Sequence, residues 1–170
     1  MDNIKDKNII NELRESDNTT PFFSLNGLKT VGKIVDVYDG DTCTINIIIP
    51  NIIKTKFLGF IKTKTTYVIQ KYKCRMNGYD SAEMKPLKSD INRELIKKKA
   101  IEDRDYFCKL VKFSDNHNNI INIECLEFDK YGRLLINIFN DDNIKINDLM
   151  IENNHGYVYS GGTKKKFDDN

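Results

Sequence analysis

The sequence lacks the features that mark secreted, membrane-spanning and disulfide-rich proteins. Its four cysteines have no short paired spacing, which argues against a zinc site and against a disulfide framework. No apolar run approaches the roughly 18 residues that a membrane span requires, and the first residues lack the basic-then-apolar order of a secretory signal. We therefore expect a soluble protein, intracellular or cytoplasmic, that has no membrane partner.

An excess of charge of one sign is also absent. The 27 basic and 25 acidic residues leave a net charge of +2, which is too weak to identify a nucleic-acid binder by itself. Only five of the basic residues are arginines. In so lysine-rich a chain, an arginine is a candidate for a task that needs the planar guanidinium with its fork of donors.

The 170 residues suffice for one compact domain and hardly for two. The polar first stretch ends in a helix-breaking run, and the last stretch is rich in glycine and then in lysine. We expect a flexible leader over residues 1–20, with a short helix near residues 9–14. One folded domain is expected over residues 21–160, followed by a flexible basic tail over residues 161–170.

Strand patterns dominate the first half of the domain. Alternating residues predict a strand from about Thr30 to Val37, and the β-branched run from Thr42 to Ile49 predicts a second one. Between them, Asp39-Gly40 is typical of a tight hairpin turn. Residues 51–75 contain seven basic groups and no acidic group, and they predict a further extended pair with a turn at Gly59.

Helices and strands alternate in the second half. Apolar residues at helical spacing predict a helix over about residues 91–112. Two strands are expected over residues 118–128 and 134–139, and then a short helix over about residues 148–154 that Asn147 caps. This order predicts the α+β class, with a small β-barrel of about five strands and helices packed on it.

Three separate segments place charged residues at turns or strand ends. They run from Asp39 to Thr42, from Arg75 to Glu83, and from Asp129 to Arg133. Taken singly, each is an ordinary structural feature, since Asp-Gly is a common hairpin turn and an Asp-Ser corner is a loop. An arginine at the start of a strand is usually a solvated charge. Their combination points to chemistry on a phosphodiester.

Phosphodiester hydrolysis needs a hard cation held by oxygen ligands, a base for the attacking water, and donors for the charge that grows on the phosphate. The three segments contain all of these groups, and the guanidinium fork suits the phosphate better than lysine does. The candidates are Asp41, Asp80 and the backbone carbonyl of Ser81 as oxygen ligands, Glu83 as the base, and Arg75 and Arg133 as phosphate donors.

In their order and spacing, the three segments resemble the motifs of the staphylococcal nuclease (thermonuclease) family. That family has an Asp-Gly-Asp-Thr turn, an arginine followed five residues later by Asp-Thr-Pro-Glu, and an Asp-Lys-Tyr-Gly-Arg turn. Residues 39–42 and 129–133 match the first and third motifs residue for residue. Arg75 and residues 80–83 match the second, except that Ser81-Ala82 replaces Thr-Pro. The resemblance spans about residues 31–159.

The resemblance implies an OB-like barrel and a metal-dependent endonuclease, a hydrolase that cleaves DNA or RNA as a monomer. The implied cofactor is Ca²⁺, with other divalent ions as alternatives. Carried over by position, the roles agree with those derived from the chemistry. In addition, Asp39 is implied near the metal, and Tyr157 and Tyr159 are candidates for stacking on a substrate base or, equally, for packing in the core.

One part of the chain goes beyond the resemblance. The stretch between Asp41 and Arg75 is longer than in the smaller members of the family, which predicts an inserted basic β-hairpin over about residues 50–74. Its lysines at alternate positions share one side of a strand. They can follow the phosphate backbone of a substrate, or they can form a solubilising edge that resists strand pairing. The candidates for substrate binding are Lys54, Lys56, Lys62 and Lys64.

Two interpretations of a different class stay open. Domains of this fold also occur as catalytically inactive modules that bind nucleic acid or protein, and such a module is expected to lose one of the ionisable groups that are all present here. A plain OB-fold that binds single strands needs aromatic platforms and no clustered acids. Carboxylates repel the phosphate backbone unless a cation lies between them, so the nuclease is the leading hypothesis.

Overall fold

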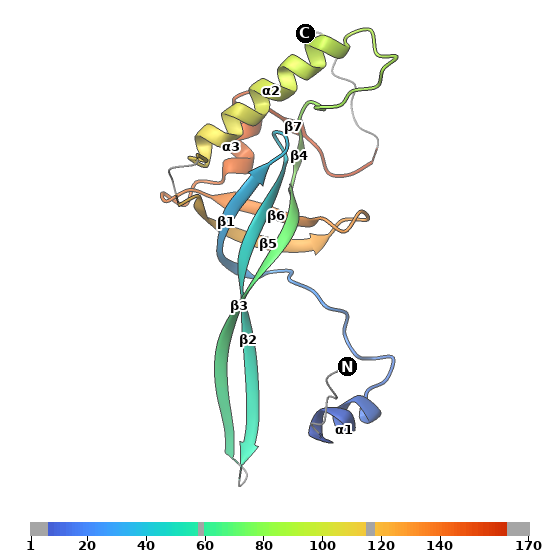
Figure 1. Cartoon of the computed structure of the whole chain (residues 1–170), viewed down its shortest axis with the longest axis vertical. Helices are drawn as coiled ribbons and strands as arrows, with labels where there is room; N and C mark the ends of the chain where they lie inside the picture. Colours follow the sequence, from blue (N-terminus) through green and yellow to red (C-terminus); the bar gives the residue numbers. More distant parts are fainter. Residues whose placement is uncertain (1–6, 58–59, 115–117, 163–170) are drawn as a thin grey trace.

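The computed structural model describes residues 7–57, 60–114 and 118–162. Within these residues, five strands close into a barrel in the order β1-β2-β3-β6-β5 (Figure 1). The barrel strands are β1 (Lys29–Val37), β2 (Thr42–Phe57), β3 (Phe60–Met76), β5 (Ile120–Phe128) and β6 (Leu134–Phe139). The remaining elements are the paired strands β4 (Tyr79–Asp80) and β7 (Tyr157–Val158) and the helices α1 (Lys7–Glu15), α2 (Arg93–Leu110) and α3 (Ile146–Glu152). The α+β class and the five-stranded barrel agree with the sequence prediction.

The barrel closes through one parallel pairing among antiparallel ones. β3 runs parallel to β6 over residues 74–76 and 134–136, and the other neighbouring strands are antiparallel. Alternate residues of each strand point into the barrel, as the sequence alternation predicts. Ile45 and Ile47 of β2 and Ile136 and Ile138 of β6 are fully buried there. The other face of β2 and β3 is therefore the outside of the barrel.

The helices have the predicted type but different ends. α2 begins at Arg93, later than the predicted start at residue 91, and it buries Ala100 and Phe107. α3 begins at Ile146, two residues before the predicted start, and it buries Met150. The predicted short helix of the leader is present as α1. None of the helices in the described ranges combines the length and the apolar character that crossing a membrane would require.

β2 and β3 continue as an antiparallel pair beyond the barrel. Their register is continuous over the whole length of both strands, whereas β1 reaches β2 only as far as Ile47 and β6 reaches β3 only at residues 74–76. We term residues 48–57 and 60–73 the β2–β3 arm. The arm extends along the longest axis of the molecule, away from α2 (Figure 1). The turn predicted at Gly59 lies outside the described residues.

Asn147 joins α3 to the barrel and to the turn before β4. Its buried side chain accepts the backbone N–H of Ile138 at 2.9 Å and donates to the carbonyls of Asn77 at 2.9 Å and Ile136 at 3.1 Å. The prediction that Asn147 caps α3 is wrong: Lys145 occupies the N-cap position, without a side-chain cap hydrogen bond. The amide is used instead to fix α3 beside the segment that leads to β4.

Replacing Asn147 with alanine should lower the free energy of unfolding by about 1–3 kcal/mol, because the substitution leaves buried backbone groups without a partner. Asn153, at the end of the same helix, is the matched control. Its exposed amide donates to the Leu149 carbonyl at 2.9 Å, so Asn153→Ala should change stability by less than about 0.5 kcal/mol. Urea unfolding measures both variants. Equal losses would contradict the anchoring role of Asn147.

Candidate active site

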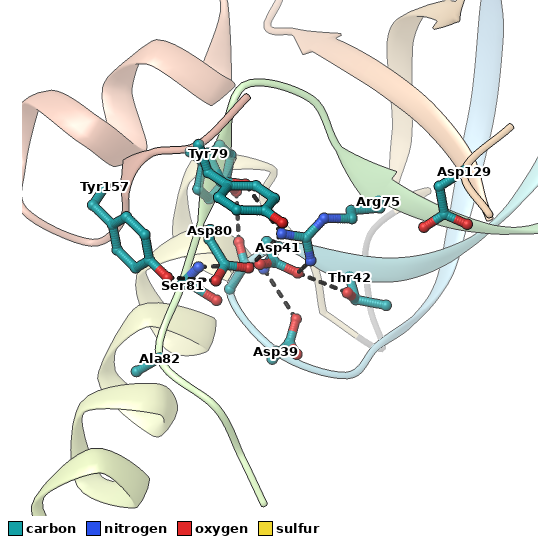
Figure 2. A network of polar contacts seen from close by, with 12 residues as sticks. Asp39, Asp41, Thr42, Arg75, Tyr79, Asp80, Ser81, Ala82, Asp129 and Tyr157 are labelled. Atoms are coloured by element: carbon teal, nitrogen blue, oxygen red, sulfur yellow. Dashed lines mark hydrogen bonds and ion pairs between the residues drawn. The ribbon is translucent and has the colours of Figure 1, made fainter. Parts of the chain in front are cut away.

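Asp41, Arg75 and Asp80 come from different elements and meet in one buried network (Figure 2). Asp41 directly precedes β2, Arg75 lies near the end of β3, and Asp80 ends β4. The antiparallel register places Thr42 opposite Arg75, which makes Asp41 a neighbour of the guanidinium although the two residues are 34 positions apart. Strand pairing thus assembles the first two sequence motifs.

The guanidinium of Arg75 bridges the two aspartates. Its Nη1 donates to Asp41 Oδ1 at 2.9 Å, and its Nη2 donates to Asp80 Oδ1. Nη2 also reaches the carbonyl of Tyr79 at 3.5 Å. Only 9% of the Arg75 side chain is exposed, against 4% and 1% for the two carboxylates. Both carboxylates depend on Arg75, because removing the guanidinium would leave two buried negative charges without compensation.

Asp41 is also held by hydrogen bonds from the segments around it. Its Oδ1 accepts the Thr42 hydroxyl at 2.7 Å, and its Oδ2 accepts the backbone N–H of Ser81 at 3.0 Å. Its own N–H donates to Asp39 Oδ1 at 3.0 Å. The turn before β2 and the loop after β4 are therefore tied together through one carboxylate.

The electrostatics of the cluster disfavour its negative charges. Burial raises the pKa of Asp41 to about 7; the neighbouring charge of Asp39 adds to this rise, and Arg75 opposes it. Burial also raises the pKa of Asp39, and the charge of Glu83 adds to that rise. Glu83 is itself exposed, so the predicted base lies at the solvent edge of an acidic cluster that a cation would stabilise.

Gly40 allows the turn before β2 to approach the loop after β4. A Cβ at this position would lie 2.9 Å from the Cβ of Asp103, which is closer than real side chains come, and a tight 3.0 Å from the Cβ of Ser81. The φ angle of Gly40 is not positive, so close approach rather than left-handed geometry requires the glycine. The Tyr79 hydroxyl donates to the Gly40 carbonyl at 2.6 Å and secures this approach.

The oxygen atoms of this cluster fit a hard cation in donor type. No group of three or more His, Cys, Asp or Glu side chains in the described ranges is arranged to hold a metal ion. Two carboxylates, from Asp41 and Asp80, are nevertheless adjacent to Ser81, whose buried Oγ has no hydrogen-bond partner among the described residues. Ca²⁺ accepts carboxylate, carbonyl and water oxygens, so these three residues are the ones that would hold it.

The two tyrosines predicted by position have different surroundings. The Tyr157 hydroxyl donates to Asp80 Oδ2 at 2.5 Å, and burial together with this bond raises the pKa of Tyr157. Tyr157 therefore orients a carboxylate and does not offer its hydroxyl to a substrate. The Tyr159 ring lies 5.6 Å from the guanidinium carbon of Arg75, and its hydroxyl donates to the Gly162 carbonyl at 2.9 Å.

A hollow of about 1240 Å³ opens beside Arg75 and Tyr159. Lys73 of β3 also lines it, and so do Tyr131 and Arg133 from the turn between β5 and β6. The hollow thus combines four cationic side chains, those of Lys73, Arg75, Lys130 and Arg133, with three tyrosines and one acid, Asp129. Cations bind a phosphate and aromatic rings stack on a base, so the lining suits a nucleotide.

Arg133 reaches this hollow from a turn that Asp129 closes. Asp129 Oδ1 accepts the N–H groups of Tyr131 and Arg133, both at 2.9 Å, and its Oδ2 accepts Arg133 Nε at 2.7 Å. Burial raises the pKa of Asp129, but the hydrogen bonds from Arg133 and Tyr131 outweigh it and lower the pKa overall. Gly132 adopts a φ of 78°, which side chains rarely allow, so the glycine permits the turn.

Asp103, which belongs to none of the sequence motifs, supports the loop after β4. This fully buried carboxylate of α2 accepts Lys99 Nζ at 2.7 Å and the Ala82 N–H at 3.3 Å. The Nδ1 of His155 lies 3.0 Å from it, and the His155 ring stacks on Tyr106 at 4.0 Å. Asp103 falls on the same helical face as the buried Ala100 and Phe107. An acid on an apolar face was the signal that could have revealed it.

The β2–β3 register sorts the lysines of the arm onto two faces. Directly paired residues share a face, and alternate residues take opposite faces. Lys71 and Lys73 share the face of Arg75, whereas Lys62 and Lys64, both exposed, lie on the opposite face. For the other two predicted lysines, Lys54 and Lys56, the structure describes the backbone and not the side chains.

Most of the candidate residues lie in two adjoining places. The buried network contains Asp39, Asp41, Arg75, Asp80, Ser81 and Tyr157, and the hollow adds Arg133 and Tyr159. The chain matches no protein-family model, and a search of curated proteins finds no match. A functional conclusion therefore rests on the geometry of the site and on the resemblance of its motifs.

The raised pKa of Asp41 predicts that the metal-free fold loses stability as the pH rises. Its pKa is about 7 in the fold against an ordinary value of 3.8, so the folded state binds the proton more tightly. The free energy of unfolding therefore declines as the pH rises from about 4 to about 7. This one group contributes a slope of at most about 1.4 kcal/mol per pH unit.

Asp41→Asn should flatten this decline, as measured by urea unfolding in EDTA across the same pH window. Asp142, an exposed acid in the turn after β6, provides the control. Asp142→Asn should leave the profile as it is in the unaltered chain. A profile that the Asp41→Asn substitution does not change would show that Asp41 is not the group whose protonation is coupled to folding.

Proposed function

We propose that this chain is a metal-dependent nuclease with an OB-like barrel, of the staphylococcal nuclease type, that hydrolyses phosphodiester bonds in DNA or RNA. The observation that carries the proposal is the convergence of Asp41, Arg75 and Asp80 in one buried network. Beside this network lies a hollow that presents Arg133 and Tyr159. The closed five-stranded barrel and the three motifs support the same assignment.

The phosphate binds between the two arginines. Arg75 and Arg133 both line the hollow, and each is held by an ion pair with a carboxylate, at 2.9 Å and 2.7 Å. A guanidinium offers paired N–H donors that match two phosphate oxygens. Because these donors are oriented before the reaction, they stabilise the charge that grows on the phosphate oxygens as the attacking oxygen approaches.

Glu83 accepts the proton of the attacking water. Its exposed position and the effect of its charge on Asp39 place it beside the acidic cluster with access to solvent. When bound at Asp41, Asp80 and the Ser81 carbonyl, Ca²⁺ or another divalent ion supplies Lewis-acid polarisation of the phosphate. Tyr157 keeps Asp80 in its orientation through the hydroxyl bond at 2.5 Å.

Digestion of plasmid DNA and of a structureless RNA tests the proposal directly. Parallel reactions contain EDTA, Ca²⁺, Mg²⁺ or Mn²⁺. Cleavage should require a divalent ion, and EDTA should abolish it, because the acidic cluster otherwise repels the phosphate. A pure protein that cleaves neither substrate with any of the ions would overturn the assignment as a nuclease.

Asp80→Ala should abolish both Ca²⁺ binding and cleavage while the fold persists. Arg75 keeps Asp41 as a partner in this variant, and removal of one of two adjacent acids relieves their repulsion. Isothermal calorimetry measures the affinity for Ca²⁺, and thermal melting in EDTA measures the stability of the fold. Asp142→Ala, on an exposed turn, serves as the control and should behave like the unaltered chain. Undiminished Ca²⁺ affinity in Asp80→Ala would remove Asp80 from the metal site.

Arg75→Lys and Arg133→Lys should each reduce kcat by about 10²–10³, because an ammonium group cannot replace the paired donors of the guanidinium. Arg104→Lys is the matched control. Arg104 pairs with its neighbour Asp105 on α2, away from the hollow, and its substitution should leave kcat unchanged. If either site variant retains full turnover, that arginine does not contact the reacting phosphate.

A second candidate function is that of a catalytically inactive module which binds nucleic acid. The observation that favours it is the pairing of both arginines with carboxylates, of Arg75 with Asp41 and Asp80 and of Arg133 with Asp129. Such a module would bind oligonucleotides in EDTA and in Ca²⁺ alike and would cleave in neither. The same digestion series therefore distinguishes the two candidates.

A further inference from the structure

The β2–β3 arm extends the strand that carries Arg75 and Lys73 away from the hollow. On β3, every second residue outward from Arg75 shares its face, because the register with β2 has no irregularity. We define the outer track as these β3 residues together with their β2 partners. Its β3 members are Lys73, Lys71, Ile69 and Tyr67, and their partners are Thr44, Asn46, Ile48 and Pro50.

The half of the track next to the site is basic. Lys73 lines the hollow beside Arg75, and Lys71 is exposed one pair further out. Their partners on β2, Thr44 and Asn46, are polar and uncharged. No acidic residue occurs in the sequence between Asp41 and Asp80. This half therefore complements a chain of phosphates that leaves the hollow.

The outer half of the track is apolar although it faces solvent. Ile69 and Tyr67 are 72% and 70% exposed, and they lie opposite Ile48 and Pro50. A contiguous apolar and aromatic patch on an exposed strand pair marks a surface that contacts a partner. A tyrosine ring is also a surface on which an unpaired base stacks, and the aliphatic side chains beside it add apolar contact area.

The opposite face of the arm has a different role near the barrel. Tyr72 is partly buried there, its ring lies 6.1 Å from that of Phe128, and its hydroxyl donates to Gln70 at 2.7 Å. Further out, this face carries Lys62 and Lys64. Lys71 and Lys73 on one face and Lys62 and Lys64 on the other thus lie in different surroundings, which supplies an internal comparison.

We propose that the outer track binds one unpaired strand of nucleic acid as it leaves the active-site hollow. Phosphates contact Lys73 and Lys71, and a base stacks on Tyr67 and packs against Ile69. In a duplex the faces of the bases are stacked on one another, and the phosphates are on the outside. Phosphates do not bind to the apolar outer half of the track, so the occupant is single-stranded. The inference rests on the proposed function, since it takes the hollow as the place where the scissile phosphate binds.

The test measures binding of the full chain to fluorescein-labelled oligothymidylate and oligouridylate by anisotropy, in EDTA and over a series of salt concentrations. Oligomers of about 4 and about 16 nucleotides bracket the lengths that single-strand-binding folds occupy. The variant Lys71→Gln/Lys73→Gln removes the track's charges, and Lys62→Gln/Lys64→Gln removes the same charge from the opposite face. Tyr67→Ala removes the stacking surface.

For the long oligomer, Lys71→Gln/Lys73→Gln should reduce the slope of log K against log salt by about 1.4, or 0.7 for each lost phosphate contact. Lys62→Gln/Lys64→Gln should leave that slope unchanged. Tyr67→Ala should weaken binding by about 5- to 150-fold at an unchanged slope. The same Tyr67→Ala substitution should not weaken binding of a blunt duplex.

Equal slope changes for the two lysine pairs would overturn the track and would favour a general solubilising charge. Failure of the unaltered chain to bind the long oligomer more tightly than the short one, or an unaltered affinity in Tyr67→Ala, would also overturn it. The two proposals fail separately. Track-dependent binding without cleavage would overturn only the nuclease, and cleavage without track-dependent binding would overturn only the track.

Discussion

The contact of Arg75 with Asp41 and Asp80 is the interaction on which the rest of the structure depends. The two carboxylates have little exposure and need the guanidinium between them, because a buried ion that loses its partner is strongly destabilising. The contact exists because the start of β2 pairs with the end of β3 and because the chain then returns through β4. The network thus couples the closing of the barrel to the assembly of the site.

The surrounding residues restrict how the two aspartates can move. Gly40 lets the first turn approach the loop after β4, and Tyr157 binds Asp80 from the strand that pairs with β4. Behind that loop, the buried Asp103 accepts the Ala82 N–H and gathers Lys99 and His155. The oxygen atoms of Asp41 and Asp80 are thus held by several elements at once. The raised pKa of Asp41 reflects the resulting electrostatic cost.

The register that forms the site also determines the character of the arm. Side chains alternate between the two faces of a strand. The register that points Arg75 to the outside of the barrel therefore also points Lys73, Lys71, Ile69 and Tyr67 to that side. The same strand sends its other residues, such as Cys74, into the core. One continuous strand therefore contributes to the barrel, to the hollow and to the proposed track. This continuity explains how a chain with a net charge of only +2 can present a basic path at one place.

The sequence alone determined the α+β class, the strand over residues 134–139, the three motifs and the basic stretch without acids. It could do so because alternation, turn chemistry and composition are local properties of the chain. Helix ends were less accurate: Asn147 was expected to cap α3 but bonds across to β6, since a buried amide serves whichever backbone groups lie nearest in space. Only the tertiary structure decided that Tyr157 binds Asp80, that Asp103 supports the loop, and that Lys62 and Lys64 lie opposite to Arg75. These facts depend on which distant strands pair and in which register, and a shift of one residue would reverse every face.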